Sequence, residues 1–252
     1  MKIVYSELYK TVYSSDPAAE AGRIESIYDV IAPYFEFVEP KPASEVDLRR
    51  AHTQRHIDSI KSDKQLYKVA ALAAGGAITA AELGYSGEPA FGLIRPPGHH
   101  ASSDSNWGFC FFSNMAVAIL KLRSEGKAEK VFILDIDLHF GDGTVNILGG
   151  LPGISILNPN HGGRKEYLAE VSEQLKLEAT KGCDIVAVSA GFDEYILDWG
   201  RRLKTEDYET IASMVKEFSD ETCAGRRFAI LEGGYYHPDL GKNVKALLDG
   251  FS

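Results

Sequence analysis

Cysteine is scarce in this chain of 252 residues, basic residues are outnumbered by acidic ones, and long apolar runs are lacking. Three cysteines, Cys110, Cys183 and Cys223, are too few and too scattered for a disulfide framework or a cysteine-based zinc site. The 27 basic residues face 36 acidic ones, giving a net charge of −9, and form no run longer than two arginines, which excludes the cationic stripe of a nucleic-acid binder. The start, MKIVYSELYK, lacks the apolar core of a signal peptide, and no apolar stretch approaches the ~20 residues of a membrane span. We therefore expect a cytoplasmic protein that binds neither nucleic acid nor membrane.

The order of predicted elements indicates an α/β fold. Strand-like runs alternate with helical patterns, and the later strands are nearly continuous apolar runs, namely VFIL, IVAV and FAIL. Strands of this kind are buried on both faces, so we expect a mainly parallel sheet covered by helices on both faces, in a single domain over residues 1–252. The predicted strands are Lys2–Tyr5, Phe35–Val38, Ala90–Arg95, Lys130–Asp135, Ile154–Leu157, Asp184–Ala190 and Arg227–Leu231. The predicted helices are Ala18–Ile31, Val69–Leu83, Ser113–Ser124, Lys165–Thr180, Thr205–Ala224 and Asp239–Leu248.

Chemically versatile side chains follow four of these strands. The pair His99-His100 follows the third strand, and the run from Asp135 to Asp142 follows the fourth. Asp193 and Tyr235 come after the last two strands. Because ligands of open parallel sheets collect beyond the carboxyl ends of the strands, we expect these side chains to share one rim.

Three of these residues form a candidate metal site. Asp137 and His139 are two positions apart, so in extended backbone their side chains lie on the same face. With Asp193 they would supply two carboxylates and one imidazole, which leaves open positions, as in catalytic rather than structural zinc sites. The alternative is that Asp137 and His139 only bind neighbouring backbone groups.

The two adjacent histidines are candidates for proton transfer. A loop that is turned by Pro96, Pro97 and Gly98 could place His99 and His100 beside the site, each with a carboxylate partner such as Asp135 or Asp142. A carboxylate on one ring nitrogen fixes the tautomer and raises the basicity of the other nitrogen. Tyr235 follows two glycines and could donate a hydrogen bond to an oxyanion, although a packed aromatic is the simpler interpretation of a lone tyrosine.

Five motifs in order resemble the histone deacetylase superfamily: RPPGHHA, WGFCFFSN, LDIDLHFGDGT, VSAGFD and LEGGYY. That superfamily comprises zinc-dependent deacetylases, acetylpolyamine amidohydrolases and acetoin-utilisation proteins, which share the arginase/deacetylase fold. The resemblance implies a zinc-dependent amidohydrolase that removes an acetyl group from an acylated primary amine, such as acetyl-lysine or a small acetylated amine. It covers residues from about Arg23, which matches an arginine beside an internal acetate channel, to Tyr235.

The resemblance also implies roles for individual residues. The metal, Zn²⁺ or another divalent ion such as Fe²⁺, would be bound by Asp137, His139 and Asp193. The residues implied for catalysis are His100 as general base, Asp142 as its orienting partner, His99 with Asp135 as electrostatic support, and Tyr235 as oxyanion donor. Gly108 and Phe109 would line the narrow tube for the acyl-amine stem. A structural K⁺ or Na⁺ would take ligands from Asp135, Asp137, His139, Ser155 and Ile156.

Some positions depart from the family pattern or point to the substrate. Asp16 stands before Pro17 where relatives carry histidine, and Phe140 replaces a second histidine. The loop over residues 158–164, which contains His161, is short, so the mouth of the tube is expected to be wide. Glu194 and Asp198 follow Asp193 and hint at an acidic rim that suits a cationic amine.

Two other functions remain open from the sequence. An arginase-like hydrolase with two manganese ions would carry an Asp-x-His-x-Asp run, whereas this chain has Asp-x-Asp-x-His around Asp137. A non-catalytic acyl-amine binding protein would be expected to have lost a ligand or the tyrosine. His52 and His56 are spaced for zinc on a helix but have no third ligand, so we interpret them as structural. The oligomeric state is not predicted, and a homo-oligomer is one way to complete an open mouth.

Overall fold

A seven-stranded sheet forms the centre of the computed structural model, which describes residues 1–160 and 162–252. Every strand pairing within these residues is parallel, and the strand order is β2-β1-β3-β7-β6-β4-β5. The mainly parallel sheet expected from the apolar runs is confirmed. The strands are β1 Lys2–Val4, β2 Glu36–Val38, β3 Ala90–Gly92, β4 Val131–Asp135, β5 Ile154–Leu157, β6 Ile185–Ala190 and β7 Arg227–Leu231.

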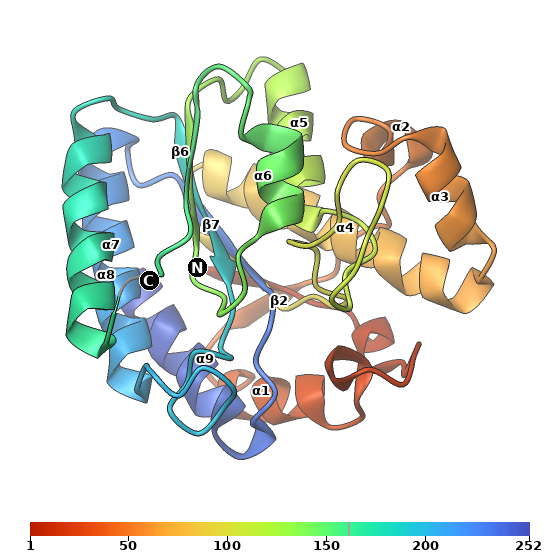
Figure 1. Cartoon of the computed structure of the whole chain (residues 1–252), viewed down its shortest axis with the longest axis horizontal. Coiled ribbons are helices and arrows are strands. Elements are labelled where there is room, and N and C mark those ends of the chain that lie inside the picture. Colours follow the sequence, from red (N-terminus) through yellow and green to blue (C-terminus); the bar gives the residue numbers. More distant parts are fainter. Residues whose placement is uncertain (161) are drawn as a thin grey trace.

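Helices cover both faces of the sheet (Figure 1). One layer contains the longest helix and its neighbours: α2 Glu45–Leu48, α3 Gln54–Lys61, α4 Lys64–Tyr85, α5 Asn114–Ser124 and α6 Asp142–Leu148. The other layer, drawn on the left and toward the bottom of Figure 1, consists of α1 Arg23–Ile31, α7 Arg164–Ala179, α8 Thr205–Thr222 and α9 His237–Phe251. Strands β4, β6 and β7 are fully buried between these layers, which is why their sequences are apolar throughout.

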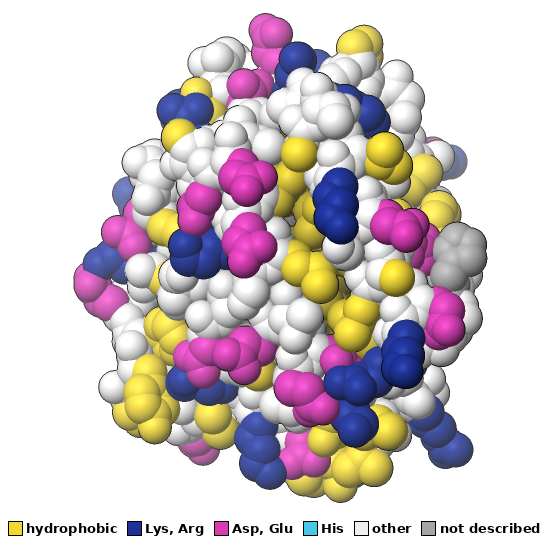
Figure 2. Space-filling view, turned by 90° about the vertical axis from the view of Figure 1, so that its left-hand side faces the viewer, with side chains coloured by type: hydrophobic (Ala, Val, Ile, Leu, Met, Phe, Trp, Pro, Cys, Tyr) yellow, Lys and Arg dark blue, Asp and Glu magenta, His cyan; other side chains and the backbone are white. Residues whose placement is uncertain are grey.

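The outer surface of the second layer carries mixed charge. Figure 2 shows acidic and basic side chains interspersed on this face, with apolar side chains gathered along a groove. A groove of about 310 Å³ between α7 and α8 is lined by Leu175, Ala179, Met214 and Phe218. Interspersed charges of both signs are the usual composition of a solvated helical face.

The N-terminal helical segment begins later than the sequence predicts. We expect a helix over Ala18–Ile31, but the structure has a short 3-10 helix, η2, at Pro17–Ala19 and then α1 from Arg23. Gly22 separates the two with φ of +87°, a left-handed conformation that an α-helix cannot include. Asp16 caps η2 by accepting a hydrogen bond from the Ala19 N–H at 3.0 Å, so the start signal belongs to the short helix.

Helix α4 is longer than the predicted Val69–Leu83 segment. By length and composition it could cross a membrane, with a mean hydropathy of 1.2, so the expectation that no stretch reaches this length is wrong. In the structure 67% of the 18-residue apolar segment of α4 that has this hydropathy is buried inside the protein. Gly84 lets α4 pack against the sheet, because an added Cβ there would lie 2.5 Å from the Arg227 carbonyl oxygen. Its apolar composition is therefore explained by its place in the core.

The strand order decides where the functional motifs lie. Strands β3, β7, β6 and β4 are consecutive neighbours, and each is followed by one of the motifs that the sequence places after strands. Since all four run in the same direction, their carboxyl ends meet at one edge of the sheet. Helix α6, which the periodicity does not predict, begins there at Asp142.

Candidate active site

Donor atoms from three side chains converge at this edge of the sheet. The Nδ1 atom of His139 lies 3.2 Å from Asp137 Oδ1 and 3.1 Å from Asp193 Oδ2. Ligand atoms that surround a tetrahedral Zn²⁺ at 2.0–2.2 Å are separated from one another by roughly 3.3 Å. The spacing of the three donors therefore fits a divalent cation, and it agrees with the set expected from the sequence.

Backbone hydrogen bonds hold both carboxylates in place. Asp137 accepts from the N–H groups of Gly233 at 2.8 Å and of His139 at 3.0 Å. Asp193 accepts from the Leu138 N–H through Oδ1 at 3.0 Å, whereas its buried Oδ2 has no hydrogen-bond partner of good geometry among the described residues. A fully buried carboxylate oxygen that lies close to two other potential metal-ligand atoms is well placed to bind a metal ion.

The electrostatics of this cluster also favour a cation. Contact of its Nδ1 with the carboxylates of Asp137 and Asp193 raises the pKa of His139 to about 10. Burial, followed by repulsion from Asp137, raises the pKa of Asp193 to about 7. Both shifts have one physical origin, since two carboxylates are buried together and favour positive charge at the point between them. A divalent ion bound at this point would supply that charge.

The two histidines of the 99–100 pair have separate carboxylate partners. The Nδ1 atom of His99 lies 3.1 Å from Asp135 Oδ2, and its Nε2 lies 3.7 Å from Asp137 Oδ1. The Nδ1 atom of His100 lies 2.7 Å from Asp142 Oδ1. An ionised carboxylate can only accept, so Nδ1 of each ring donates, and Nε2 of His100 has no hydrogen-bond partner in the part of the chain that the structure describes. The pairing follows the expectation for all four residues.

The two rings differ in charge because their surroundings differ. Burial opposes a charge on His99, but the carboxylates of Asp137 and Asp135 outweigh it and raise the pKa of His99 well above its ordinary value. Burial and the charge of His99 together lower the pKa of His100 to about 4. At neutral pH His99 is therefore an imidazolium and His100 a neutral ring with an available lone pair.

A small pocket of about 110 Å³ connects these groups to the surface. Its wall is mostly aromatic and includes Trp107, Phe109, Trp199 and Tyr235 beside His100 and His139. Tyr235 stacks on Trp199 with ring centroids 4.2 Å apart, and burial raises the pKa of its phenol well above the ordinary value. The phenol is thus kept protonated and able to donate.

Gly108 and Phe109 shape this wall through their backbone. Both residues have left-handed φ angles, of +57° and +67°. A Cβ on Gly108 would lie 2.4 Å from His100 Cδ2, so only glycine allows this contact with the ring. Phe109 is not a glycine, so its positive φ is a strained backbone conformation, and such strain is concentrated at functional sites.

The family model described as histone deacetylase domain matches residues 18–158 and 153–251 of the chain. The chain belongs to the histone deacetylase family.

Individual members of the family align along most of the chain. The histone deacetylase-like amidohydrolase of Pseudomonas aeruginosa is 28% identical over 284 residues, covering 90% of this chain and 75% of that protein. A probable deacetylase of Methanothermobacter thermautotrophicus is 28% identical and covers 99% and 90%. The chain spans about half (48%) of the length of the rice protein named histone deacetylase 10, chloroplastic, at 31% identity. The crystal structure of the HDA15 HD domain superposes with a TM-score of 0.86 at 23% identity, over 99% of this chain and 88% of that one, which shows that the fold is shared.

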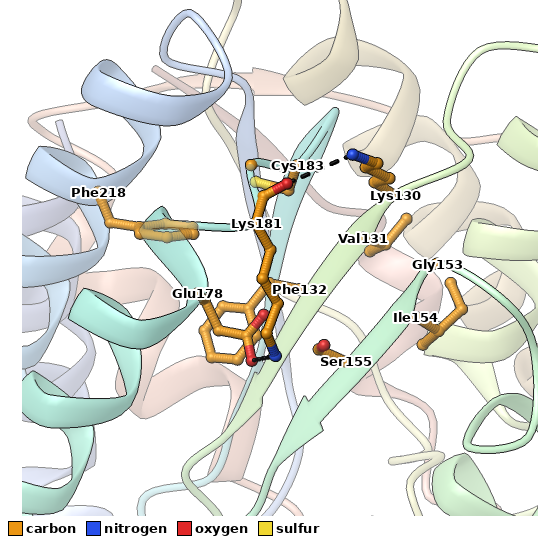
Figure 3. Close-up of a pocket in the computed structure, with 11 residues that line it drawn as sticks. Lys130, Val131, Phe132, Gly153, Ile154, Ser155, Glu178, Lys181, Cys183 and Phe218 are labelled. Atoms are coloured by element: carbon orange, nitrogen blue, oxygen red, sulfur yellow. Dashed lines mark hydrogen bonds and ion pairs between the residues drawn. The ribbon is translucent and has the colours of Figure 1, made fainter.

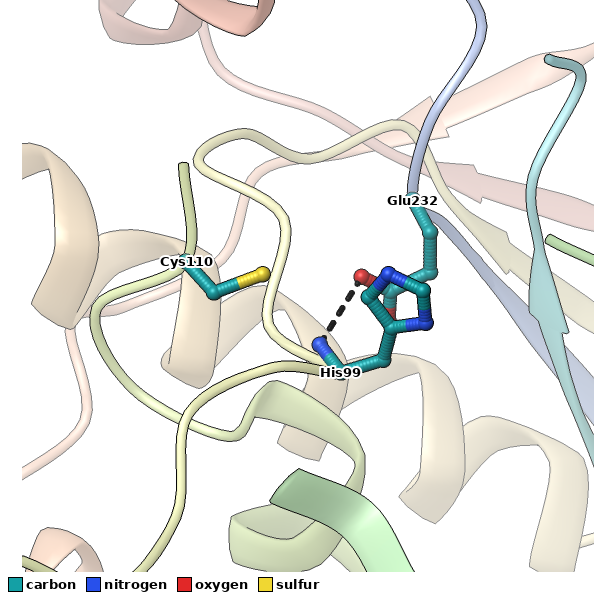
Figure 4. Close-up of side chains that lie close together, drawn as sticks. All are labelled: His99, Cys110 and Glu232. Carbon is teal, nitrogen blue, oxygen red and sulfur yellow. Dashed lines mark hydrogen bonds between the residues drawn. The ribbon is translucent and has the colours of Figure 1, made fainter. Parts of the chain in front are cut away.

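One residue of this deacetylase-family site received no role from the sequence. Glu232 is buried directly after β7 and accepts from the backbone N–H group of Gly98 at 2.7 Å. It also accepts from the backbone N–H group of His99 at 3.2 Å (Figure 4). It thereby ties the histidine loop to the neighbouring strand. The sequence signal that could have identified Glu232 is its position between an apolar strand and two glycines. Burial raises the pKa of the adjacent Cys110 thiol, so this cysteine behaves as a small buried apolar group.

The acidic rim suggested by Glu194 and Asp198 is absent from the pocket mouth that the structure describes. Glu194 is 1% exposed and lies beside Arg202, with 3.4 Å between Nε and Oε2. Asp198 is 7% exposed and accepts from the backbone N–H groups of Trp199, Tyr235 and Tyr236. Both carboxylates are structural, because the loop after Asp193 turns them inward. The outer wall is formed instead by Trp107 and Trp199.

The structural-cation set is not assembled as the resemblance implies. Strand register places Ser155 beside Phe132 and Ile156 beside Ile133, short of the level of Asp135. Ser155 lines a separate cavity of about 260 Å³ at the amino ends of the strands, together with Lys130 and Cys183 (Figure 3). The prediction for Ser155 is therefore wrong, since the chain reaches the level of Asp135 only at Asn158.

Two other histidines, His52 and His56, and Arg23 have structural contacts. His52 and His56 are buried and bind the backbone at Ser113 and Phe111. Arg23 is fully buried and donates to the carbonyl groups of Glu232 and Gly234, beneath the Tyr235 ring. His161 lies outside the described residues.

Proposed function

We propose that the protein is a metal-dependent amidohydrolase that hydrolyses the amide of an acylated primary amine, acetyl-lysine or a small acetylated amine. The observation that carries this proposal is the convergence of three metal donors, a neutral histidine with a carboxylate partner and a protonated phenol on one pocket. These are the parts that amide hydrolysis with activated water requires. The names of the bacterial and archaeal relatives, amidohydrolase and deacetylase, support the same reaction.

Asp137, His139 and Asp193 would hold the metal, with Zn²⁺ as the ion that best suits two carboxylates and an imidazole. When bound, the ion supplies a Lewis acid that polarises the acyl carbonyl and lowers the pKa of water. The buried Oδ2 of Asp193 and the raised pKa of His139 support the fit of this donor set.

The protein groups then carry the proton. The Nε2 lone pair of neutral His100 accepts a proton from the attacking water, while Asp142 holds the opposite nitrogen. The same ring returns that proton to the nitrogen of the leaving amine, so that the amide bond breaks without releasing an anionic amine. Burial and the neighbouring His99 lower the pKa of His100 to about 4, which makes the protonated ring a good acid for the second step.

Tyr235 stabilises the charge that develops on the acyl oxygen. Its phenol lines the pocket beside the donor cluster and keeps its proton at neutral pH. A hydrogen bond that strengthens as the oxyanion forms lowers the barrier more than it strengthens substrate binding.

A two-metal hydrolase is less well supported by the contacts. The second group of potential ligands comprises His99, Cys110 and Glu232. His99 donates from Nδ1 to Asp135, Glu232 accepts from two backbone N–H groups, and the Cys110 sulfur accepts from the His100 N–H. These donors are thus committed to holding the histidine loop.

Metal analysis and a substrate panel test the proposal. The purified protein, reconstituted with Zn²⁺ or Fe²⁺, is offered acetyl-lysine peptides, acetylpolyamines and simple N-acetyl amines. We expect one metal ion per chain and hydrolysis of at least one class. Replacing Tyr235 by Phe should lower kcat by roughly 10²–10³ and His100→Ala at least as much, with unchanged metal content. Absence of turnover on the whole panel in the metal-loaded protein would contradict the proposal.

A further inference from the structure

Trp107 contacts both members of the His100–Asp142 pair. Its ring lies over the His100 imidazole with centroids 3.9 Å apart and an interplanar angle of 31°. Its indole N–H donates to Asp142 Oδ2 at 2.9 Å. The other oxygen of the same carboxylate accepts from His100 Nδ1 at 2.7 Å. One carboxylate therefore fixes two rings that are in contact with each other.

The His100 ring is enclosed on several sides by such contacts. The ring of His99 lies 4.0 Å from it, centroid to centroid. The backbone of Gly108, the residue after Trp107, approaches so closely that an added Cβ would lie 2.4 Å from His100 Cδ2. Rotation of the imidazole would have to displace either the indole or this backbone. The free Nε2 is consequently held on the side away from Asp142.

Core packing does not account for the position of this tryptophan. Its side chain remains 54% exposed, although burying an indole is among the larger apolar contributions to stability. Trp199, on the same pocket, is 49% exposed, and its side chain makes ring contacts with Tyr235 and His139. Of these two similar tryptophans, Trp107 is the one that donates to a carboxylate paired with the base.

We propose that Trp107 is a positioning residue for His100, acting through Asp142 and through the face of the imidazole. The inference rests on the proposed function, because it assigns Trp107 to the orientation of that reaction's base. The indole N–H occupies the second carboxylate oxygen, which prevents Asp142 from rotating away and keeps the His100 Nδ1 bond in line. Trp107 is thus expected to affect kcat rather than substrate binding.

A spectroscopic test is independent of turnover. The chain contains two tryptophans, so an ¹⁵N-labelled sample gives two indole N–H signals, which the Trp107→Phe and Trp199→Phe variants assign. Asp142→Asn replaces the charged acceptor by a neutral one. We expect the Trp107 signal to move much further than the Trp199 signal in that variant. A Trp107 signal that does not respond to Asp142→Asn would overturn the proposed contact.

Kinetics test the catalytic consequence on the best substrate of the panel. Trp107→Phe keeps an aromatic face but loses the donor, and we expect about a tenfold lower kcat with KM within a factor of two. Trp107→Leu, which also loses the face, should lower kcat further. Adding Trp107→Phe to Asp142→Asn should cause little additional loss, since both act through one bond.

The outcomes separate the two proposals. A wild-type kcat in Trp107→Phe, or losses that multiply in the double variant, would overturn the positioning role while leaving the amidohydrolase intact. A wild-type protein that hydrolyses no substrate would overturn the proposed function and with it the catalytic role. The indole signals would still report whether Trp107 binds Asp142 in that case.

Discussion

His52 links the stability of the fold to pH through two backbone hydrogen bonds. The Ser113 N–H donates to its Nε2 at 2.9 Å, and its Nδ1 faces the Ser102 carbonyl oxygen at 3.0 Å. Because Nε2 accepts, the ring must be neutral, with its proton on Nδ1. The side chain is buried, and burial, together with the neighbouring His56, lowers the pKa of His52 to about 4. A proton added at Nε2 would break the bond to Ser113.

The sign and size of the effect follow from linkage. An unfolded histidine titrates near a pKa of about 6.5, so between about pH 6.5 and pH 4 the unfolded chain binds a proton that native His52 does not. The free energy of unfolding therefore decreases as the pH falls through this range and has its full value above about pH 7. At about 1.4 kcal/mol per pKa unit, the contribution lost is about 2 kcal/mol by pH 5 and about 3 kcal/mol by pH 4.

Urea unfolding of the wild type and of His52→Gln measures this contribution. Glutamine can accept from Ser113 but does not titrate, so groups common to both proteins cancel in the difference. At pH 7.5 the wild type should be more stable by about 1–2 kcal/mol, because the variant loses the bond to Ser102. That advantage should shrink by about 2 kcal/mol between pH 7 and pH 5. A difference that stays constant with pH would refute the neutral, buried assignment of His52.

Three further predictions concern the site. Gly108→Ala should lower kcat at least tenfold, because the added Cβ would lie 2.4 Å from His100 Cδ2. Gly126→Ala is the control: Gly126 also has a positive φ but has open space around it, so this variant should lose stability only. Measurements of kcat and Tm for both variants test this prediction. Asp193→Asn should reduce metal content in elemental analysis, since it removes one charged ligand of three, and a metal content equal to that of the wild type would exclude Asp193 as a ligand. Removing metal with a chelator should lower Tm, because bound metal offsets the repulsion between Asp137 and Asp193, and Zn²⁺ should restore it; a Tm that is indifferent to metal would count against the site.

The helices and strands could be predicted where apolar periodicity is strong. Strands β5 and β7 have the predicted bounds, and the buried strands β4 and β6 differ by one residue. Short elements were missed, because a seven-residue helix such as α6 has too few turns for its period to stand out from the loop around it. The Ala18–Ile31 prediction failed at Gly22, whose left-handed backbone interrupts a segment of otherwise helical spacing.

The residues that form the site could be predicted, but the side chains that line its mouth could not. Asp137, His139 and Asp193 could be grouped because parallel strands bring their carboxyl ends together. The direction of a loop side chain has no such periodicity, which is why Glu194 and Asp198 were wrongly placed at the rim. Ser155 was wrongly assigned to the structural-cation site for a related reason. The sequence does not specify the register of β5 against β4, and a shift of a few residues along β5 changes which end of the sheet a side chain reaches.

The sequence by itself determined the parallel sheet, the family and the chemical groups at its edge, because apolar runs, strand-end motifs and residue types are local properties. The tertiary structure decided the charge states of His99 and His100, the inward direction of Asp198 and the contact of Trp107 with Asp142. Each of these depends on distances between residues that are far apart in the chain, and on burial, which no local pattern specifies.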